Sequence, residues 1–231
     1  MFTRVQGVVR VLMCVVVAAL VISVGTVEAE YVPALIQVVL DASGSVSVND
    51  FQKANQVVAD FTDVLVARSI GHQGELSDWI AVSYFGGEDE YSGTDFIKCA
   101  DSYDMGSLYT HLRTMSHPQF GQTAIYNAAA LGTIEMLTMA ETLQALTSGR
   151  SAFFKILVVV TDGQDTASSA ELKSAVRQAY PNGEILLCVV GVGNGAKIAE
   201  FQGIADMALQ IENFDELLAT LFLVLELVSA V

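Results

Sequence analysis

The pattern of apolar and polar positions along the chain predicts strands that alternate with helices. Apolar runs at 35–40, 79–85, 155–160 and 185–190 have the length of buried strands, and segments of helical length lie between them. Strands that are apolar on both faces and alternate with helices favour a parallel sheet with helices on both sides. The pattern therefore predicts an α/β fold.

Polar residues and helical spacing indicate where the remaining elements begin and end. Asn49 and Asp50 can cap a helix whose apolar positions continue to Leu65. A polar loop at 88–93 is followed by a short β-prone stretch at 96–99, which we interpret as an edge strand. The pattern also predicts a short strand at 208–211 and helices at 105–115, 123–147 (the longest), 168–179, 197–205 and 214–231.

The first 29 residues have the composition of a secretory signal peptide. Arg4 and Arg10 are followed by an apolar stretch at 11–24, and Val27-Glu28-Ala29 fits the small-residue cleavage pattern. We expect cleavage after Ala29 and a secreted or extracytoplasmic protein. The alternative is an uncleaved membrane anchor, although the stretch is short for a spanning helix of about 20 residues. Residues 30–231 are enough for one domain with a sizeable core.

Charge and cysteine content narrow the classes of function. The formal net charge is −15 with only 11 Lys and Arg residues, which argues against a nucleic-acid partner because phosphate binding needs clustered basic side chains. Two cysteines, Cys99 and Cys188, follow the predicted leader. Whether they form a disulfide stays open, because a bridge requires a closeness in space that the sequence does not define.

The segment Asp41-Ala42-Ser43-Gly44-Ser45 comes directly after the first apolar run. One carboxylate and two hydroxyls therefore lie where a strand ends, which is the usual place for a site in an open α/β sheet. An all-oxygen set suits Mg²⁺ or Mn²⁺ and lacks the thiols and imidazoles that zinc or copper prefers. Taken alone, Asp41 and Ser43 are better explained as residues that cap turns.

Two further segments make the metal interpretation specific. Gly121-Gln122-Thr123-Ala124-Ile125-Tyr126-Asn127-Ala128 lies at the start of the longest predicted helix, and Thr161-Asp162-Gly163 follows an apolar strand. In order and context, these segments and Asp41-x-Ser43-x-Ser45 resemble the three loops of the metal-ion-dependent adhesion site of von Willebrand factor type A domains, such as integrin inserted domains. The resemblance covers nearly the whole chain after the first thirty residues.

The resemblance implies a three-layer, Rossmann-like fold with a mostly parallel sheet, one short antiparallel edge strand and helices on both faces. It implies that Ser43 and Ser45 bind the metal directly, and that Asp41 and Asp162 bind it directly or through water. Thr123 would come into contact with the metal when ligand is held. The resemblance also implies Mg²⁺ or Mn²⁺ as the cation, and a protein partner whose Asp or Glu carboxylate completes the coordination.

Alternatives from other classes have weaker support. The segment Gly191-Val192-Gly193-Asn194-Gly195-Ala196 matches a dinucleotide fingerprint, but no acidic residue is placed to hold a ribose. Ser43 has no evident general base, so we expect no enzyme. A structural or assembly module, in which metal only stabilises the fold, is the main alternative to adhesion. His117 and Phe120 adjoin the metal loop and either define ligand preference or pack the loop.

Overall fold

One mainly parallel sheet forms the centre of the computed structural model, which describes residues 31–70, 77–146, 153–180 and 184–229. The sheet order is β3-β2-β1-β5-β6-β7, and neighbours among β2, β1, β5, β6 and β7 are parallel. These five strands are β1 (Ala34–Asp41), β2 (Trp79–Phe85), β5 (Phe154–Thr161), β6 (Leu186–Val192) and β7 (Met207–Ile211). The predicted leader, residues 1–29, lies outside the described residues.

The antiparallel edge consists of two short pieces. Both β3 (Tyr91–Gly93) and β4 (Ile97–Lys98) pair antiparallel with β2. The predicted edge strand at 96–99 corresponds to β4, but the interpretation of 88–93 as a loop was wrong for its second half. Three residues, two of them exposed, carry no apolar signal, so only the pairing with β2 defines β3.

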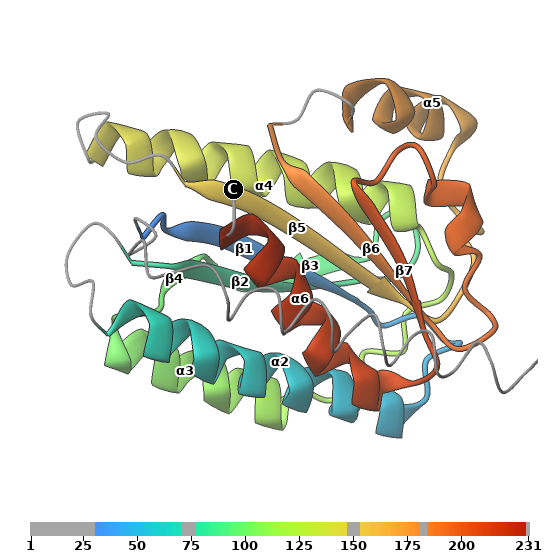
Figure 1. The fold of residues 1–231 in the computed structure, drawn as a ribbon. Coiled ribbons are helices and arrows are strands. Elements are labelled where there is room, and N and C mark those ends of the chain that lie inside the picture. The colour runs from blue at the N-terminus through green and yellow to red at the C-terminus, as the bar shows by residue number, and fades with distance from the viewer. Residues whose placement is uncertain (1–30, 71–76, 147–152, 181–183, 230–231) are drawn as a thin grey trace, which may run out of the picture. The chain divides into compact units, whose positions relative to one another are not determined.

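Helices cover both faces of the sheet, as Figure 1 shows. On one face, Ile36, Val38 and Leu40 pack in the same core as buried residues of α2, α3 and α6. On the other face, Leu35 and Val39 share a core with residues of α4 and α5. Successive side chains of β1 therefore point alternately into two cores, one on each face of the sheet. The fold has three layers as a result. The helices are α2 (Val48–Ser69), α3 (Ser102–Thr114), α4 (Ile125–Leu146), α5 (Ala170–Ala179) and α6 (Leu217–Ser229).

Several helix boundaries differ from the prediction. The N-cap of α2 is Ser47, whose Oγ accepts a hydrogen bond of 3.1 Å from the Asp50 backbone N–H, so the assignment of the cap to Asn49 or Asp50 was wrong. The expected helix at 197–205 is only a 3₁₀ turn, η2 (Ile198–Phe201). The terminal helix begins with a second 3₁₀ turn, η3 (Phe214–Glu216). The last residue of the longest predicted helix, residue 147, lies outside the described residues.

The parallel strands bring their carboxyl ends to one edge of the sheet. The two central strands β1 and β5 pair in register from Ala34 with Phe154 to Leu40 with Val160, so the loops after Asp41 and Thr161 lie next to each other. Among the described residues, no helix has the length and hydropathy needed to cross a membrane.

Candidate metal centre

Three loops bring the predicted metal-binding side chains together at this edge. Thr123 Oγ1 donates a hydrogen bond of 3.0 Å to Ser43 Oγ, which shares a hydrogen bond of 3.0 Å with Ser45 Oγ. Ser45 Oγ in turn donates to Asp162 Oδ1 at 2.8 Å. Asp41 is tied to the same group, since its Oδ1 accepts from the Ser43 backbone N–H at 2.8 Å. All five residues thus form one continuous cluster of oxygen atoms.

The cluster is deep on one side and open on the other. Asp41, Ser43 and Thr123 are buried, with exposed fractions of 5%, 1% and 6%. Ser45 is exposed and Asp162 is half-buried. A cation held by these oxygens would therefore be reached from solvent over Ser45 and Asp162.

The carboxylates of the cluster are desolvated, and nearby His117 compensates the charge of Asp162 only weakly. Burial raises the pKa of Asp41 to about 6, against the smaller effects of hydrogen bonds from Ser43 and Thr161. Burial is also the main reason that the pKa of Asp162 is raised. In the described part of the chain, no Lys or Arg forms an ion pair with either carboxylate. The cluster therefore lacks a positive charge, which a bound cation would supply.

The donor set fits a hard divalent cation. It offers two carboxylates and three hydroxyls, all of which are oxygen ligands of the kind that Mg²⁺ and Mn²⁺ take. Across the described ranges, no three His, Cys, Asp or Glu side chains gather into a metal-binding group. A site of the thiol and imidazole type is thus absent from the described residues, and the hydroxyl-rich cluster is the metal candidate.

Thr161 is a functional residue that the sequence analysis missed. Its Oγ1 donates a hydrogen bond of 2.6 Å to Asp41 Oδ2 and accepts one of 3.1 Å from the Gly163 backbone N–H. Thr161 therefore fixes the orientation of the Asp41 carboxylate from the neighbouring strand. The Thr-Asp-Gly motif shows that Thr161 stands beside Asp162. The motif does not show the hydrogen bond to Asp41, which is 120 positions earlier in the chain.

Glu90 is a second residue without a role in the sequence analysis. Its Oε2 accepts hydrogen bonds from the backbone N–H groups of Gly87, at 2.7 Å, and Gly121, at 2.8 Å. Gly121 lies two residues before Thr123, so the Glu90 carboxylate holds the second metal loop against the loop after β2. Within the acidic stretch 88–90, Glu90 therefore stabilises the two loops.

The loop that contains His117 and Phe120 packs against the first metal loop. The Phe120 backbone N–H donates to Ala42 O at 3.0 Å. His117 Nδ1 accepts from the Gln119 N–H at 2.9 Å, and its ring packs edge-on against Phe51 with 4.7 Å between centroids. Burial lowers the pKa of His117. These contacts explain both residues by loop packing, which was one of the two interpretations of the sequence.

The glycine-rich turn after β6 packs against the third metal loop. A Cβ added to Gly195 would lie 2.5 Å from the backbone oxygen of Asp162, and one added to Gly191 would lie 2.3 Å from an Ile198 side-chain carbon. Gly193 has a φ of +71°, a conformation that glycine adopts readily. Close packing and turn geometry thus account for the glycines that match a dinucleotide fingerprint.

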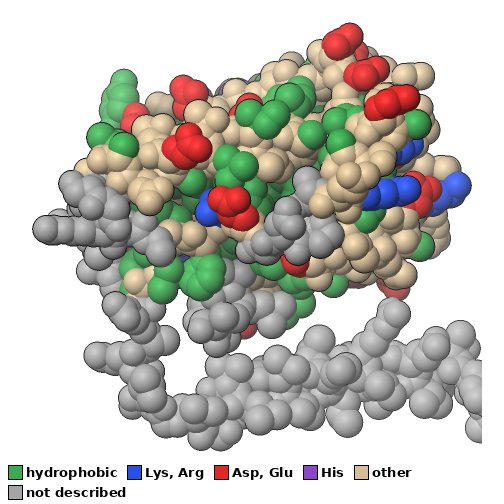
Figure 2. All heavy atoms as spheres, turned by 90° about the horizontal axis from the view of Figure 1, so that it is seen from above, with side chains coloured by type: hydrophobic (Ala, Val, Ile, Leu, Met, Phe, Trp, Pro, Cys, Tyr) green, Lys and Arg blue, Asp and Glu red, His purple; other side chains and the backbone are tan. Residues whose placement is uncertain are grey.

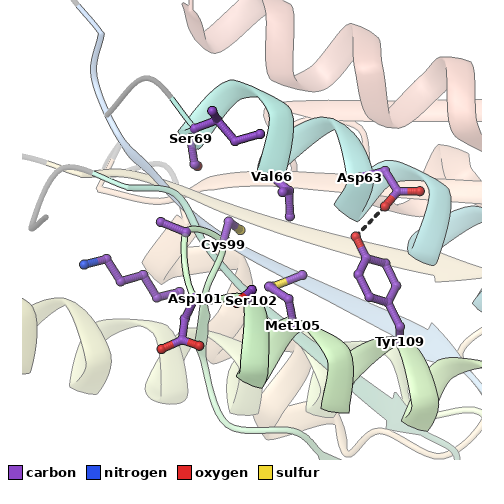
Figure 3. A pocket seen from close by; sticks show the side chains of 11 residues that line it. Asp63, Val66, Ser69, Cys99, Asp101, Ser102, Met105 and Tyr109 are labelled. Carbon is purple, nitrogen blue, oxygen red and sulfur yellow. Dashed lines mark hydrogen bonds between the residues drawn. The ribbon is translucent and has the colours of Figure 1, made fainter. Parts of the chain in front are cut away.

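A hollow on another side of the domain is separate from the metal loops. Figure 3 shows this cavity of about 710 Å³ between α2 and α3, with Cys99 in its wall and Tyr109 donating a hydrogen bond to Asp63. It lies beside β4, which pairs with the amino end of β2 at Trp79 and Ile80, whereas the metal loops lie at the carboxyl ends. Both Cys99 and Cys188 are buried and free, so the structure contains no bridge between them.

Comparisons with solved structures agree with the observed fold. The structure of proximal thread matrix protein 1 from the mussel byssus with a zinc-occupied MIDAS motif has 20% identity and a TM-score of 0.62, and the match covers 86% of this chain and 48% of that chain. The open form of the pilus adhesin SpaC from Lactobacillus rhamnosus GG has 13% identity and a TM-score of 0.62, with 87% and 30% covered. Manganese-loaded TRAP protein of Plasmodium vivax has 16% identity and a TM-score of 0.53, with 81% and 71% covered.

The chain spans about half the length of the mussel protein, and a comparison with curated protein sequences gives no match. The family model of the von Willebrand factor type A domain matches residues 36–221. This range begins within β1, ends within α6 and contains all three metal loops. The chain therefore belongs to the von Willebrand factor type A domain family.

Proposed function

We propose that this chain is a non-enzymatic adhesion domain that binds a protein partner through a divalent cation. The cation, Mg²⁺ or Mn²⁺, is held by Asp41, Ser43, Ser45, Thr123 and Asp162. An Asp or Glu carboxylate of the partner completes its coordination. The observation that carries this proposal is the chain of hydrogen bonds that joins the side chains of Thr123, Ser43, Ser45 and Asp162 at a solvent-accessible edge, with the Asp41 carboxylate tied to it by the Ser43 backbone N–H.

The balance of charge in the cluster supports recognition of an anion. Ser43, Ser45 and Thr123 offer neutral hydroxyls, and each carboxylate already accepts a hydrogen bond from a neighbouring hydroxyl. When bound, the cation would supply a Lewis-acidic position that attracts a carboxylate oxygen. Thr161 keeps the Asp41 carboxylate oriented toward the hydroxyl group of Ser43, and the exposed Ser45 leaves room for an incoming group.

The neighbouring structures support the two parts of the proposal separately. The mussel byssus protein has zinc in its MIDAS motif, and the Plasmodium vivax protein was loaded with manganese. The Lactobacillus rhamnosus protein is a pilus adhesin. Together with the leader predicted at 1–29, these neighbours support a secreted or extracytoplasmic location, with membrane attachment only if that segment is retained.

Metal binding is tested by calorimetric titration with Mg²⁺ and Mn²⁺ of a chain that begins at Glu30, which keeps the compact unit Val32–Ser229. The expected result is saturable binding that disappears in the Asp41→Ala, Ser43→Ala double variant. A double variant of two exposed residues on α2 and α3, Asp60→Ala with Ser107→Ala, is the matched control. A folded chain that binds neither ion would contradict the proposal.

Carboxylate recognition is tested on the Mn²⁺-loaded chain by water proton relaxation. A carboxylate that enters the coordination of Mn²⁺ displaces bound water, so the peptide acetyl-Gly-Glu-Gly-amide should reduce the relaxation enhancement. The isosteric peptide acetyl-Gly-Gln-Gly-amide should leave it unchanged. Equal effects of the two peptides, together with saturable metal binding, would favour the alternative in which metal only stabilises an assembly module.

A further inference from the structure

A groove between α4 and α5 is lined by apolar and acidic residues. Its volume is about 630 Å³. The apolar lining consists of Ala130, Leu131, Ile134, Leu172 and Ala175, and the charged lining consists of Glu88, Asp89 and Glu171. Apolar and acidic side chains also lie side by side on the face seen in Figure 2, which is the side of α4 and α5 in Figure 1.

The groove has an apolar lining that the domain covers only in part, since Leu172 also packs against the core. Ile134 is 61% exposed although it sits mid-helix on α4. Leu131 and Leu172 are only partly buried. A single exposed apolar side chain is ordinary, but Ile134 lies in one hollow with two partly buried leucines, which gives a partner an apolar surface to cover.

The charge around the groove is of one sign. All three charged lining residues are acidic, and each of them is exposed. The nearby bases of α5 face elsewhere, because Lys173 pairs with Asp165 at 2.6 Å and Arg177 donates to Tyr126 Oη at 3.1 Å. The complementary occupant therefore combines aliphatic side chains with Lys or Arg.

The groove begins beside the metal loops. Asn127 lines it and lies one helical turn after Thr123. The Thr123 backbone oxygen accepts hydrogen bonds from the N–H groups of Thr166 and Ala167, at 2.8 and 3.1 Å, which ties the segment before α5 to the second metal loop. From Asn127 to Ile134 the helix rises about 10 Å, which is the length of about three extended residues.

Asn127 connects the lining of the groove to the loop after β2. Its Nδ2 donates to the Glu88 backbone oxygen at 3.1 Å, but its Oδ1 has no hydrogen-bond partner among the described residues. This oxygen is buried from solvent, so the contacts of a bound segment would come from the exposed residues of the lining.

We propose that the α4–α5 groove is a second docking surface, which takes a short basic segment with aliphatic side chains from the partner. This proposal rests on the proposed function, because the partner is the same protein in both. That partner would place its carboxylate on the cation and its basic segment in the groove. The two contacts act on different residues, and each can be measured alone.

The probe for the groove is the peptide acetyl-Lys-Leu-Arg-Leu-Lys-amide, which has no carboxylate and therefore cannot bind through the cation. Amide NMR titration of the chain from Glu30 should show saturable shifts around Ile134 and Leu172, with equal affinity in EDTA and in Mg²⁺. Two control peptides separate the contributions of charge and of apolar side chains. The peptide acetyl-Lys-Ser-Arg-Ser-Lys-amide keeps the positive charge without the leucines, and acetyl-Glu-Leu-Glu-Leu-Glu-amide keeps the leucines with negative charge. Equal binding of either control would overturn the proposal.

Variants with matched controls test the residues. Ile134→Ser should weaken binding of the basic peptide about tenfold, because a large apolar contact is lost, whereas Leu146→Ser, at another exposed position of α4, should not. Glu171→Gln should weaken binding about twofold to fivefold, as expected for one exposed charge pair, whereas Glu141→Gln should not. Unchanged affinity in both groove variants would overturn the proposal.

The outcomes separate this proposal from metal-dependent adhesion. Saturable metal binding without peptide binding would overturn the groove proposal alone, and peptide binding without metal binding would overturn the adhesion proposal alone. Sedimentation velocity tests for the other occupant, a second copy of the chain. Concentration-dependent dimerisation that Ile134→Ser abolishes would also overturn the assignment to a basic partner.

Discussion

At the scale of single residues, Asp41 is held in an environment that opposes its own charge. Burial raises its pKa to about 6, and a carboxylate with a raised pKa destabilises the fold once it is ionised. The oxygen that would bind metal is therefore a source of instability in the metal-free protein. Under the proposed function, metal binding and stability are opposed at this position.

Asp41→Asn should stabilise the metal-free chain at neutral pH. The folded state holds the Asp41 proton more tightly than the unfolded state, so the wild-type free energy of unfolding falls as pH rises from about 4 to about 6. The difference between the variant and the wild type should be small below pH 4 and should reach at most about 3 kcal/mol above pH 6. Urea unfolding in EDTA at both ends of this range measures it, with Asp60→Asn as an exposed control.

The opposite outcome for Asp41→Asn would also be informative. If the variant were less stable than the wild type at neutral pH in EDTA, the loss of hydrogen bonds would exceed the relief of desolvation. The desolvation argument for the cation would then fail.

Thr161→Val should weaken metal binding without unfolding the chain. The substitution removes the hydroxyl that donates to Asp41 Oδ2 but keeps the shape of the side chain. Loss of a residue that orients a ligand typically reduces metal affinity about 10-fold to 100-fold. Mn²⁺ titration by calorimetry checks this, and Thr110→Val on the exposed side of α3 is the control. Full affinity in Thr161→Val would mean that Asp41 needs no orientation from β5.

Much of the metal cluster was predictable from sequence, whereas its supporting residues were not. Asp41, Ser43, Ser45, Thr123 and Asp162 stand in short motifs that predict their closeness, and the structure brings them together. Thr161 and Glu90 act through hydrogen bonds to residues 120 and 31 positions away. Their roles depend on which strands and loops are neighbours, and no local pattern carries that information.

At the scale of elements, the turn between β6 and η2 supports the third metal loop. Gly195 approaches the Asp162 backbone oxygen so closely that an added Cβ would lie 2.5 Å away. A Cβ cannot be accommodated at that distance without a backbone shift. The position of Asp162 therefore depends on an element that contributes no ligand.

Gly195→Ala should lower both metal affinity and stability. The turn and the Asp162 loop must move apart, at a cost of about 1–3 kcal/mol in the free energy of unfolding. Gly106→Ala is a matched control, because an added Cβ meets no atom within 4 Å in α3 and should stabilise the helix by about 0.5–1 kcal/mol. Urea unfolding and Mn²⁺ titration of both variants are the measurements. Unchanged metal affinity in Gly195→Ala would show that the contact does not position Asp162.

Element types were predictable where the periodic signal is long, and failed where it is short. The strand at 79–85 has the predicted bounds, and α4 and α5 fall within two residues of their predicted starts. The three-residue β3 was missed because only Tyr91 packs against the core, and one residue forms no periodic signal. The segment 197–205 was overestimated as a helix because Ile198 and Phe201 have helical spacing but belong to one 3₁₀ turn.

At the scale of the whole molecule, a cation that binds only the folded state should stabilise all of it. At a metal concentration 100 times the dissociation constant, the free energy of unfolding should rise by about 2.7 kcal/mol. For a domain of this size the midpoint of thermal unfolding should rise by about 5–10 °C. Differential scanning calorimetry in EDTA and in Mn²⁺ measures the shift, which the Asp41→Ala, Ser43→Ala variant should lack. A shift of equal size in that variant would place the stabilising cation elsewhere.

The hydrogen bond between Ser45 and Asp162 joins residues 117 positions apart, and this separation has a consequence for folding during synthesis. A growing chain that ends before β5 contains four of the five oxygen-bearing residues. It lacks Asp162 and the strand that places Asp162 beside the other four. Contacts between such distant positions form late, because the entropy of closing a long loop must first be overcome. Capture of the cation would therefore require β5 to have joined β1, although β6 and β7 are still to be added to the sheet, and a chain that ends before Asp162 would remain without the cation.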